Sequence, residues 1–167
     1  GGPQHPAVLE ALDLGGAVDV ELLLPLDAAD VEFARAAMPA PAVVISPCSS
    51  QRSRNFRNWA VEHFVTVTQY LYEHLKVKVV LTGGNSALEK EYARVISEQA
   101  GATNLVGRTS LKQLFALIAA ADLVICPDSG PAHMATAAGT PVIGLYATSN
   151  PDRTGPYLSR TLCVNRY

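Results

Sequence analysis

From residue 42 onward, short runs of β-branched and other apolar residues alternate with longer stretches whose apolar residues recur every three or four positions. The runs have the length of strands, and the stretches between them have the period of helices. The expected strands cover residues 42–46, 77–82, 104–106, 122–126 and 141–146, with a last short run at 161–164. Because strands that alternate with helices are joined by right-handed crossovers, the pattern predicts a parallel sheet with helices on both faces.

The predicted fold class is therefore α/β, with a Rossmann-like, doubly wound parallel sheet. In the usual doubly wound order, 3-2-1-4-5-6, the winding reverses between the first and fourth strands, and ligands bind outside the carboxyl ends of those strands. If this chain has that order, the loops at the ligand-binding edge are residues 47–58 and 127–130. These are the most polar and least regular loops of the alternating region, so topology and loop chemistry indicate the same edge.

Capping signals mark where the helices begin. Ser86 with Glu89, and Ser110 with Gln113, have the spacing of capping boxes, in which two side chains satisfy backbone N–H groups at a helix start. The helix that opens at Ser110 is expected to bury one apolar face, beginning with Leu111.

Residues 1–40 are the least regular part of the chain, because prolines and glycines divide them into short pieces. One helix is predicted there, at 27–37, with Asp27 as its cap. A chain of 167 residues is long enough for one domain with its own core and too short for two large ones. We therefore expect a linker and one helix from an interdomain region at 1–40, and a Rossmann-like domain at 41–167.

The composition argues against several classes of protein. No run of eighteen apolar residues occurs, so no transmembrane helix is expected, and 49% apolar with 17% charged residues is typical of a soluble globular protein. The net charge of -2 gives no general field for nucleic acid. Cys48, Cys126 and Cys163 are odd in number and lack CxxC spacing, which disfavours a disulfide framework or zinc site and favours small buried side chains.

The stretch CPDSGPAH, at 126–133, joins the fourth strand to a helix of small residues. It brings an acid, a hydroxyl, a glycine and a histidine to a helix start, where unpaired N–H groups and the positive end of the helix dipole attract anionic or hydroxyl-rich ligands. Pro131 at the first helical position, after a hydroxyl, is also what a well-capped helix uses. Capping alone requires neither His133 nor Gly130, so the stretch favours a ligand site, with plain capping as the alternative.

The loop at 46–59 carries several hydroxyls and three arginines, Arg52, Arg54 and Arg57. The planar guanidinium group suits phosphate oxygens, so a diphosphate clamp is one interpretation and a solvated basic loop is the other. Arg57 is favoured as a ligand because it lies nearest the helix start. Trp59 is expected to anchor the core.

Several common nucleotide and hydrolase motifs are missing from the sequence. Gly83-Gly84-Asn85 does not extend to GxGxxG, and no GxxxxGK[ST] occurs, so a nicotinamide dinucleotide or P-loop site is disfavoured. The lack of GxSxG disfavours a serine hydrolase built on Ser129.

Five segments, taken in order, resemble the C-terminal half of the ADP-heptose:lipopolysaccharide heptosyltransferases, glycosyltransferase family 9. They are the hydroxyl-rich loop ending in RNW at 57–59, LTGG at 81–84 before a glutamate-rich helix, NLVGRTSL at 104–111, DSGPAH at 128–133, and GTPV at 139–142. The resemblance covers about residues 42–157. Each segment alone is a weak signal, and their common order makes the resemblance specific.

The resemblance implies a GT-B glycosyltransferase, in which two Rossmann-like domains face each other and the C-terminal one, here 41–167, holds the nucleotide-sugar donor. The implied reaction transfers heptose from ADP-heptose to the inner core of lipopolysaccharide. In that family the general base is an aspartate of the N-terminal domain, which we expect this chain to lack. We therefore expect donor binding without turnover by this chain alone, and no catalytic residue within it.

The resemblance also assigns roles to single residues. Ser49 and Ser50 match a hydroxyl pair that meets the diphosphate, and Arg57 matches a basic position that is usually lysine. Thr109 matches a residue that lines the nucleoside pocket. The chain departs from the family in the arginine, which changes the geometry of the contact, and in a longer loop between Ser50 and Arg57.

The segment with Asp128, Ser129, Gly130 and His133 matches the part of the family that contacts the heptose and the phosphates. In the whole enzyme, Asp128 would orient sugar hydroxyls, while Arg57 and the helix start would stabilise the departing diphosphate.

The turn at Gly83, Gly84 and Asn85, together with Glu89, supplies further candidates for donor binding. The acid that binds the ribose is left open, with Glu89 as one choice and Asn85 as a residue that could take over its role.

The resemblance implies no required cofactor. No set of metal ligands is visible in the sequence, so Mg²⁺ is possible but not indicated. The implied partners are the nucleotide-sugar donor and, through the N-terminal domain, the lipopolysaccharide core, with no nucleic acid. The implied location is cytoplasmic, with a peripheral position at the inner face of the inner membrane as a further option. The alternatives are a GT-B transferase or epimerase with a UDP-sugar, and a non-catalytic nucleotide-binding module.

Overall fold

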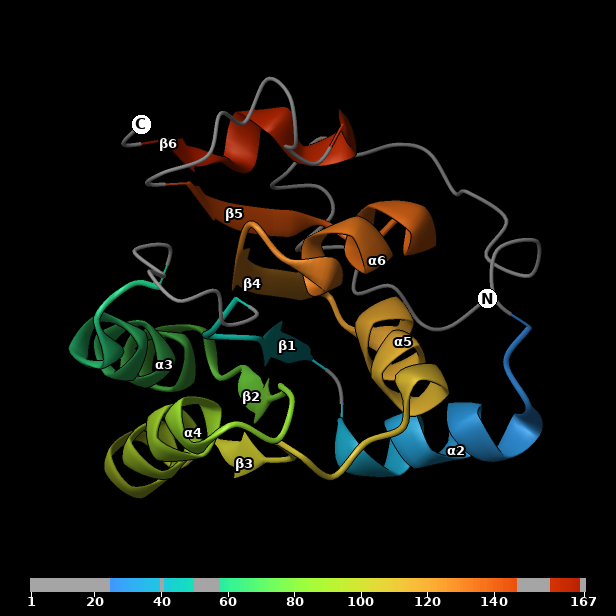
Figure 1. Ribbon diagram of the computed structural model, residues 1–167, viewed down its shortest axis with the longest axis horizontal. Coiled ribbons are helices and arrows are strands. Elements are labelled where there is room, and N and C mark those ends of the chain that lie inside the picture. The colour runs from blue at the N-terminus through green and yellow to red at the C-terminus, as the bar shows by residue number, and fades with distance from the viewer. Residues whose placement is uncertain (1–24, 40, 50–57, 147–156, 166–167) are drawn as a thin grey trace.

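The computed structural model describes residues 25–39, 41–49, 58–146 and 157–165 (Figure 1). These residues form one sheet of six strands, ordered β3-β2-β1-β4-β5-β6, and every pairing is parallel. The strands are β1 (Ala42–Ile45), β2 (Lys78–Leu81), β3 (Thr103–Asn104), β4 (Leu123–Pro127), β5 (Val142–Tyr146) and β6 (Val164–Asn165). The helices are α2 (Ala28–Ala37), α3 (Val61–Leu75), α4 (Ala87–Ala100), α5 (Leu111–Ala120), α6 (Gly130–Ala138) and the 3-10 helix η2 (Tyr157–Leu162).

Strand β1 lies where the winding of the sheet reverses. Its Ile45 pairs with Leu81 of β2 on one side and with Ile125 of β4 on the other. The predicted α/β class and doubly wound order are thus confirmed, and β1 and β4 end next to each other at the carboxyl edge of the sheet. At the opposite edge, the Asp122 carboxylate accepts a 2.8 Å hydrogen bond from the backbone N–H of Ala42, which joins the starts of these two strands.

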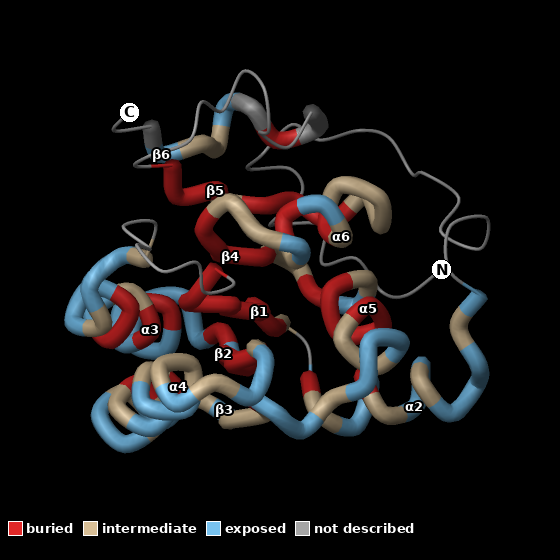
Figure 2. The backbone as a smooth tube through the Cα atoms, viewed as in Figure 1, coloured by how far each residue is buried: buried red, intermediate tan, exposed pale blue. Residues whose placement is uncertain are grey.

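Both faces of the sheet are covered, as the strand and helix pattern predicts. Because successive side chains of a strand point to opposite faces, Val44 packs with apolar residues of α2, α5 and α6, whereas Val43 and Ile45 pack with those of α3 and α4. Strand β1 is buried at every position (Figure 2). Burying one such aliphatic side chain contributes roughly 1.5–3 kcal/mol, so the central strands hold the carboxyl edge in place.

Helix α2, the helix predicted at 27–37, packs against α5 (Figure 1). Ala34 is 1% exposed within the shared core. Asp27 is the N-cap of α2, and its Oδ2 atom lies 3.2 Å from Nζ of Lys112 in the first turn of α5. An exposed ion pair of this kind adds little stability, so the apolar contact is what fixes α2 on the sheet.

Two side chains that the sequence predicts to be buried are exposed. Trp59 is 36% exposed because it precedes α3; its ring centroid lies 4.7 Å from that of His63 and 5.5 Å from that of Phe64. Phe64, one turn into α3, is 0% exposed and takes the core position. Leu111 is 62% exposed because it is the first residue of α5, ahead of the turns that lie on the sheet.

The smaller differences concern the last strand and the cysteines. The first two residues of the run at 161–164 belong to η2, and β6 begins only at Val164. Cys48 and Cys126 are buried as expected, whereas Cys163 is half-buried.

Candidate functional site

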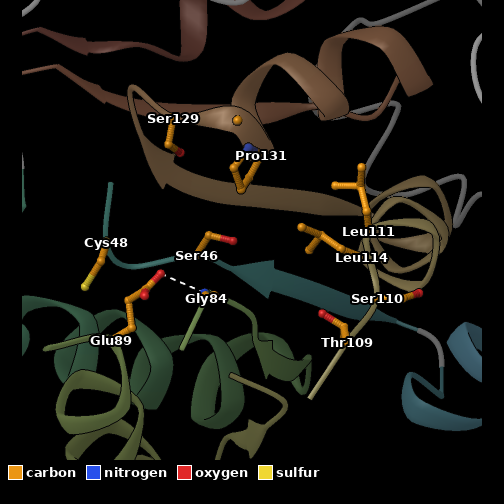
Figure 3. Close-up of a pocket in the computed structure, with 12 residues that line it drawn as sticks. Ser46, Cys48, Gly84, Glu89, Thr109, Ser110, Leu111, Leu114, Ser129 and Pro131 are labelled. Carbon is orange, nitrogen blue, oxygen red and sulfur yellow. Dashed lines mark hydrogen bonds between the residues drawn. The ribbon is translucent and has the colours of Figure 1, made fainter. Parts of the chain in front are cut away.

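A pocket of about 310 Å³ opens at the carboxyl edge of the sheet, where the topology predicts a ligand site (Figure 3). The loops after β1 and β2, together with α4, contribute Ser46, Cys48, Gly83, Gly84 and Glu89. The start of α5 contributes Thr109, Ser110, Leu111 and Leu114, and the start of α6 contributes Ser129, Gly130 and Pro131. Of the site residues predicted from sequence, Gly83, Gly84, Glu89, Thr109, Ser129 and Gly130 therefore lie around one pocket.

Among the described residues that line the pocket, Glu89 is the one carboxylate, and three hydrogen bonds hold it. The backbone N–H of Gly84 donates to Oε1 at 2.7 Å, and the backbone N–H and hydroxyl of Ser86 donate to Oε2 at 3.1 and 2.6 Å. Burial would raise the pKa of Glu89, but these hydrogen bonds together outweigh burial and lower it below its ordinary value. A carboxylate has about four acceptor positions, so one is left for a ligand hydroxyl.

Two glycines allow the loop after β2 to approach this carboxylate. A Cβ atom on Gly84 would lie 3.0 Å from Oε2 and 3.2 Å from Oε1 of Glu89, and one on Gly83 would lie 3.3 Å from Oε1. Asn85, the other candidate for the ribose contact, is exposed and does not line the pocket. The geometry therefore favours Glu89 over Asn85 at this position.

The start of α6 faces the same pocket without a side-chain cap. Ser129 is the N-cap residue, but its hydroxyl donates to the carbonyl of Pro127 at 3.0 Å and accepts no cap hydrogen bond. A Cβ atom on Gly130 would meet nothing within 4 Å, so the space beside the helix start is open. The capping alternative is therefore not realised by Ser129, and the positive end of the helix dipole is directed at the pocket.

Asp128 and His133 flank the start of α6 but do not line the pocket. Asp128 is half-buried after β4, where its charge adds to burial in raising the pKa of Tyr146. His133 is exposed in the first turn of α6. Neither residue therefore belongs to the described lining of the pocket.

The loop after β1 carries the remaining predicted residues. Ser49 is buried, and its backbone N–H and hydroxyl donate to Oδ1 of Asn58 at 2.9 and 3.3 Å, so these two side chains join the ends of the loop. Ser50 and Arg57 lie outside the residues that the structure describes. The expected diphosphate contacts of these residues stay predictions.

Several lining residues escape the sequence analysis. Ser46 directly follows β1, and Cys48 lies two residues later. Both precede Ser49 and Ser50, the hydroxyl pair of the family motif. Burial, and then the charge of Glu89, raises the pKa of the Cys48 thiol to about 12, so the thiol stays neutral. Leu111 and Leu114 add an apolar surface. Leu111 is expected from the sequence on the buried apolar face of α5, and only the structure shows that it is exposed at the pocket.

A family model for glycosyltransferase family 9 (heptosyltransferase) matches residues 8–166, which is most of the chain. The chain belongs to glycosyltransferase family 9. The resemblance read from the five sequence segments is thereby confirmed.

Curated members of family 9 are similar to this chain over part of their length. The lipopolysaccharide core heptosyltransferase OpsX of Haemophilus influenzae is 44% identical over 127 residues, covering 75% of this chain and 35% of OpsX. Lipopolysaccharide heptosyltransferase 2 of Escherichia coli is 35% identical over 106 residues, covering 60% of this chain and 30% of that protein. The chain thus spans about a third of the length of the curated relatives it matches.

The fold agrees with that of a solved family 9 enzyme. The structure of E. coli ADP-heptose lps heptosyltransferase II superposes with a TM-score of 0.67 at 28% identity, covering 85% of this chain and 45% of that one. Among the residues the structure describes, no helix has the length and apolar character needed to cross a membrane.

Proposed function

We propose that this family 9 chain is the donor-binding part of a glycosyltransferase that transfers heptose from ADP-heptose to the inner core of lipopolysaccharide. The single observation that carries the proposal is the pocket itself, because it joins an ionised carboxylate, an apolar surface and an open helix start. A nucleoside diphosphate presents the complementary groups: ribose hydroxyls, a base and two phosphates. The printed names of the relatives supply the heptose and lipopolysaccharide parts of the proposal.

Each part of the pocket suits one part of the donor. Glu89 has one acceptor position for a ribose hydroxyl, and Thr109 with Leu111 and Leu114 suits the nucleoside, whose base is flat and has apolar faces. The start of α6 suits the phosphates, because helix N-termini bind anions through their N–H groups and dipole.

The sugar is proposed to lie toward Asp128 and His133, beyond the start of α6. In this arrangement Asp128 orients heptose hydroxyls, and Arg57, with Ser49 and Ser50, meets the diphosphate as it departs. Stabilising that charge is the contribution of this half of the enzyme. The general base and the acceptor site belong to the other half, so we propose that this chain binds donor without turnover.

The proposed division of the chain places a linker and α2 at 1–40 and the donor domain at 41–167. No required cofactor is proposed. We place the enzyme in the cytoplasm, where it would meet the lipopolysaccharide core at the inner face of the inner membrane.

A thermal-shift and calorimetry series with ADP, ADP-heptose and UDP tests the proposal. Stabilisation by ADP and more strongly by ADP-heptose supports it. Preferential stabilisation by UDP would favour a UDP-sugar enzyme, and a response to ADP unchanged by the sugar would favour a non-catalytic nucleotide-binding module. Heptose transfer by this chain alone would contradict the assignment of the general base to another domain.

A further inference from the structure

Two buried hydroxyls meet at the carboxyl ends of β1 and β2. The Oγ atom of Ser46 and the Oγ1 atom of Thr82 are 2.5 Å apart, and either could be the donor. Ser46 is 2% exposed and Thr82 is 0% exposed. The difference between them is their surroundings, because Ser46 lines the pocket and Thr82 does not.

Counting hydrogens decides which hydroxyl donates. Each hydroxyl carries one hydrogen, and a single hydrogen bond between them uses only one of the two. If Ser46 donated, the hydrogen of Thr82 would be left in the core, where the described residues give it no other partner, and a buried donor without an acceptor is costly. If Thr82 donates, the spare hydrogen belongs to Ser46 and faces the pocket.

The position of Ser46 indicates what its hydrogen meets there. Figure 3 shows the Ser46 hydroxyl between the wall that holds Glu89 and the wall formed by Ser129 and Pro131, and directed into the space between them. Glu89, as an ionised carboxylate, accepts hydrogen bonds and therefore suits ligand hydroxyls. The Ser46 hydroxyl, whose own hydrogen is unused when it accepts from Thr82, suits a group that only accepts, and phosphate oxygens are such a group.

We propose that Ser46, oriented by a hydrogen bond that it accepts from Thr82, donates its hydroxyl hydrogen to a phosphate oxygen of the nucleotide-sugar donor. This inference rests on the proposed function, because it assumes that the pocket holds a nucleoside diphosphate. It adds a binding residue that lies before the family's hydroxyl pair, directly after the end of β1. Thr82 has a positioning role.

The test compares Ser46→Ala, Thr82→Val and the double variant, each titrated with ADP and with adenosine. Ser46→Ala is expected to raise the Kd for ADP about tenfold, since a hydrogen bond to a charged oxygen is lost, and to leave the Kd for adenosine within about twofold. Thr82→Val keeps the Ser46 hydrogen, so its Kd for ADP should change by less than about threefold.

The double variant separates binding from stability. Ser46→Ala leaves the Thr82 hydrogen without an acceptor and should lower the Tm, whereas removing both hydroxyls should restore much of the Tm. The ADP affinity should stay at the level of Ser46→Ala. Recovery of ADP affinity together with Tm would show that Ser46 is only structural and would overturn the inference.

Four further outcomes overturn it. If Ser46→Ala loses equal affinity for ADP and for adenosine, the phosphate is not the partner of Ser46. If Thr82→Val binds ADP more tightly, Ser46 is the donor to Thr82 in the unsubstituted protein. If the unsubstituted protein binds ADP and Ser46→Ala binds it equally well, Ser46 has no role in binding, and the proposed function still stands. No binding of ADP by the unsubstituted protein removes the proposed function as well.

Discussion

The Glu89 carboxylate accepts a 2.7 Å hydrogen bond from the backbone N–H of Gly84, five residues earlier in the chain. This contact connects the loop after β2 to the first turn of α4 and holds a negative charge at the pocket. A side chain at position 84 would occupy the space that the carboxylate uses. The glycine and the glutamate therefore act as one unit in shaping this wall.

Replacing Glu89 with glutamine should weaken binding of adenosine and ADP alike. The amide keeps the size of the side chain but presents N–H donors where the carboxylate accepts, so the Kd for both ligands should rise about tenfold. Calorimetric titration measures this. Glu98→Gln is the matched control, since Glu98 lies on the same helix, is 60% exposed and pairs with Arg94. Unchanged adenosine affinity in Glu89→Gln would contradict the ribose contact.

The lowered pKa of Glu89 predicts a pH dependence of stability. Its folded-state pKa lies below the ordinary value of 4.5, so the carboxylate adds stability above that value and loses it as the pH falls through the folded-state pKa. The Tm difference between the unsubstituted protein and Glu89→Gln should be largest near about pH 6–7 and shrink below about pH 4.5. Thermal unfolding between those limits checks the trend, and a difference that grew on acidification would refute it.

Gly84→Ala should damage both stability and ligand binding. The new Cβ would lie 3.0 Å from Oε2 of Glu89, so the carboxylate must move and its hydrogen bonds must lengthen. Unfolding in urea should show a loss of about 1–3 kcal/mol, in the range of other overpacked sites. A variant as stable as the parent would mean that the carboxylate relaxes freely.

Gly130→Ala should weaken ADP binding without lowering stability. Nothing lies within 4 Å of a Cβ at this position, so the free energy of unfolding should change by less than about 0.5 kcal/mol. The methyl group would stand at the start of α6, where we place the phosphates, so ADP affinity should fall while adenosine affinity is retained. Full ADP affinity in this variant would place the phosphates elsewhere.

Asp128→Ala should affect the binding of ADP-heptose and of ADP to different extents. Asp128 follows β4 outside the pocket wall, so its loss should weaken ADP-heptose binding much more than ADP binding. Parallel titrations with both ligands measure the ratio. Equal losses for the two ligands would count against a sugar contact.

The sequence predicts the sheet well, because alternation of strands with helices leaves few topologies and capping spacings such as that of Ser86 locate helix starts. The sequence does not predict which way the side chains of the site point. The spacing of Ser86 and Glu89 is that of any capping box, and only the loop after β2 shows that the same carboxylate lines a pocket. Likewise, a serine just before a helix is expected to cap it, yet the Ser129 hydroxyl donates to the carbonyl of Pro127 instead.

Two errors share a physical cause, which is the position of a residue relative to a helix end. Trp59 is the largest apolar side chain near α3 but precedes the helix, so Phe64 fills the core. Leu111 has the spacing of the buried face of α5 but lies in the first turn, ahead of the sheet. Ser46 escapes the sequence analysis because a serine directly after a buried strand has no local pattern to set it apart.

The two ends of strand β1 have different roles. Its first residue, Ala42, is fixed by Asp122 at one edge of the sheet, and Ser46 follows its last residue at the pocket, with a buried apolar stretch between them. A change at the Asp122 end can therefore reach the pocket only by moving the strand, whereas a change at Ser46 alters the ligand contact and the buried hydroxyl pair at once.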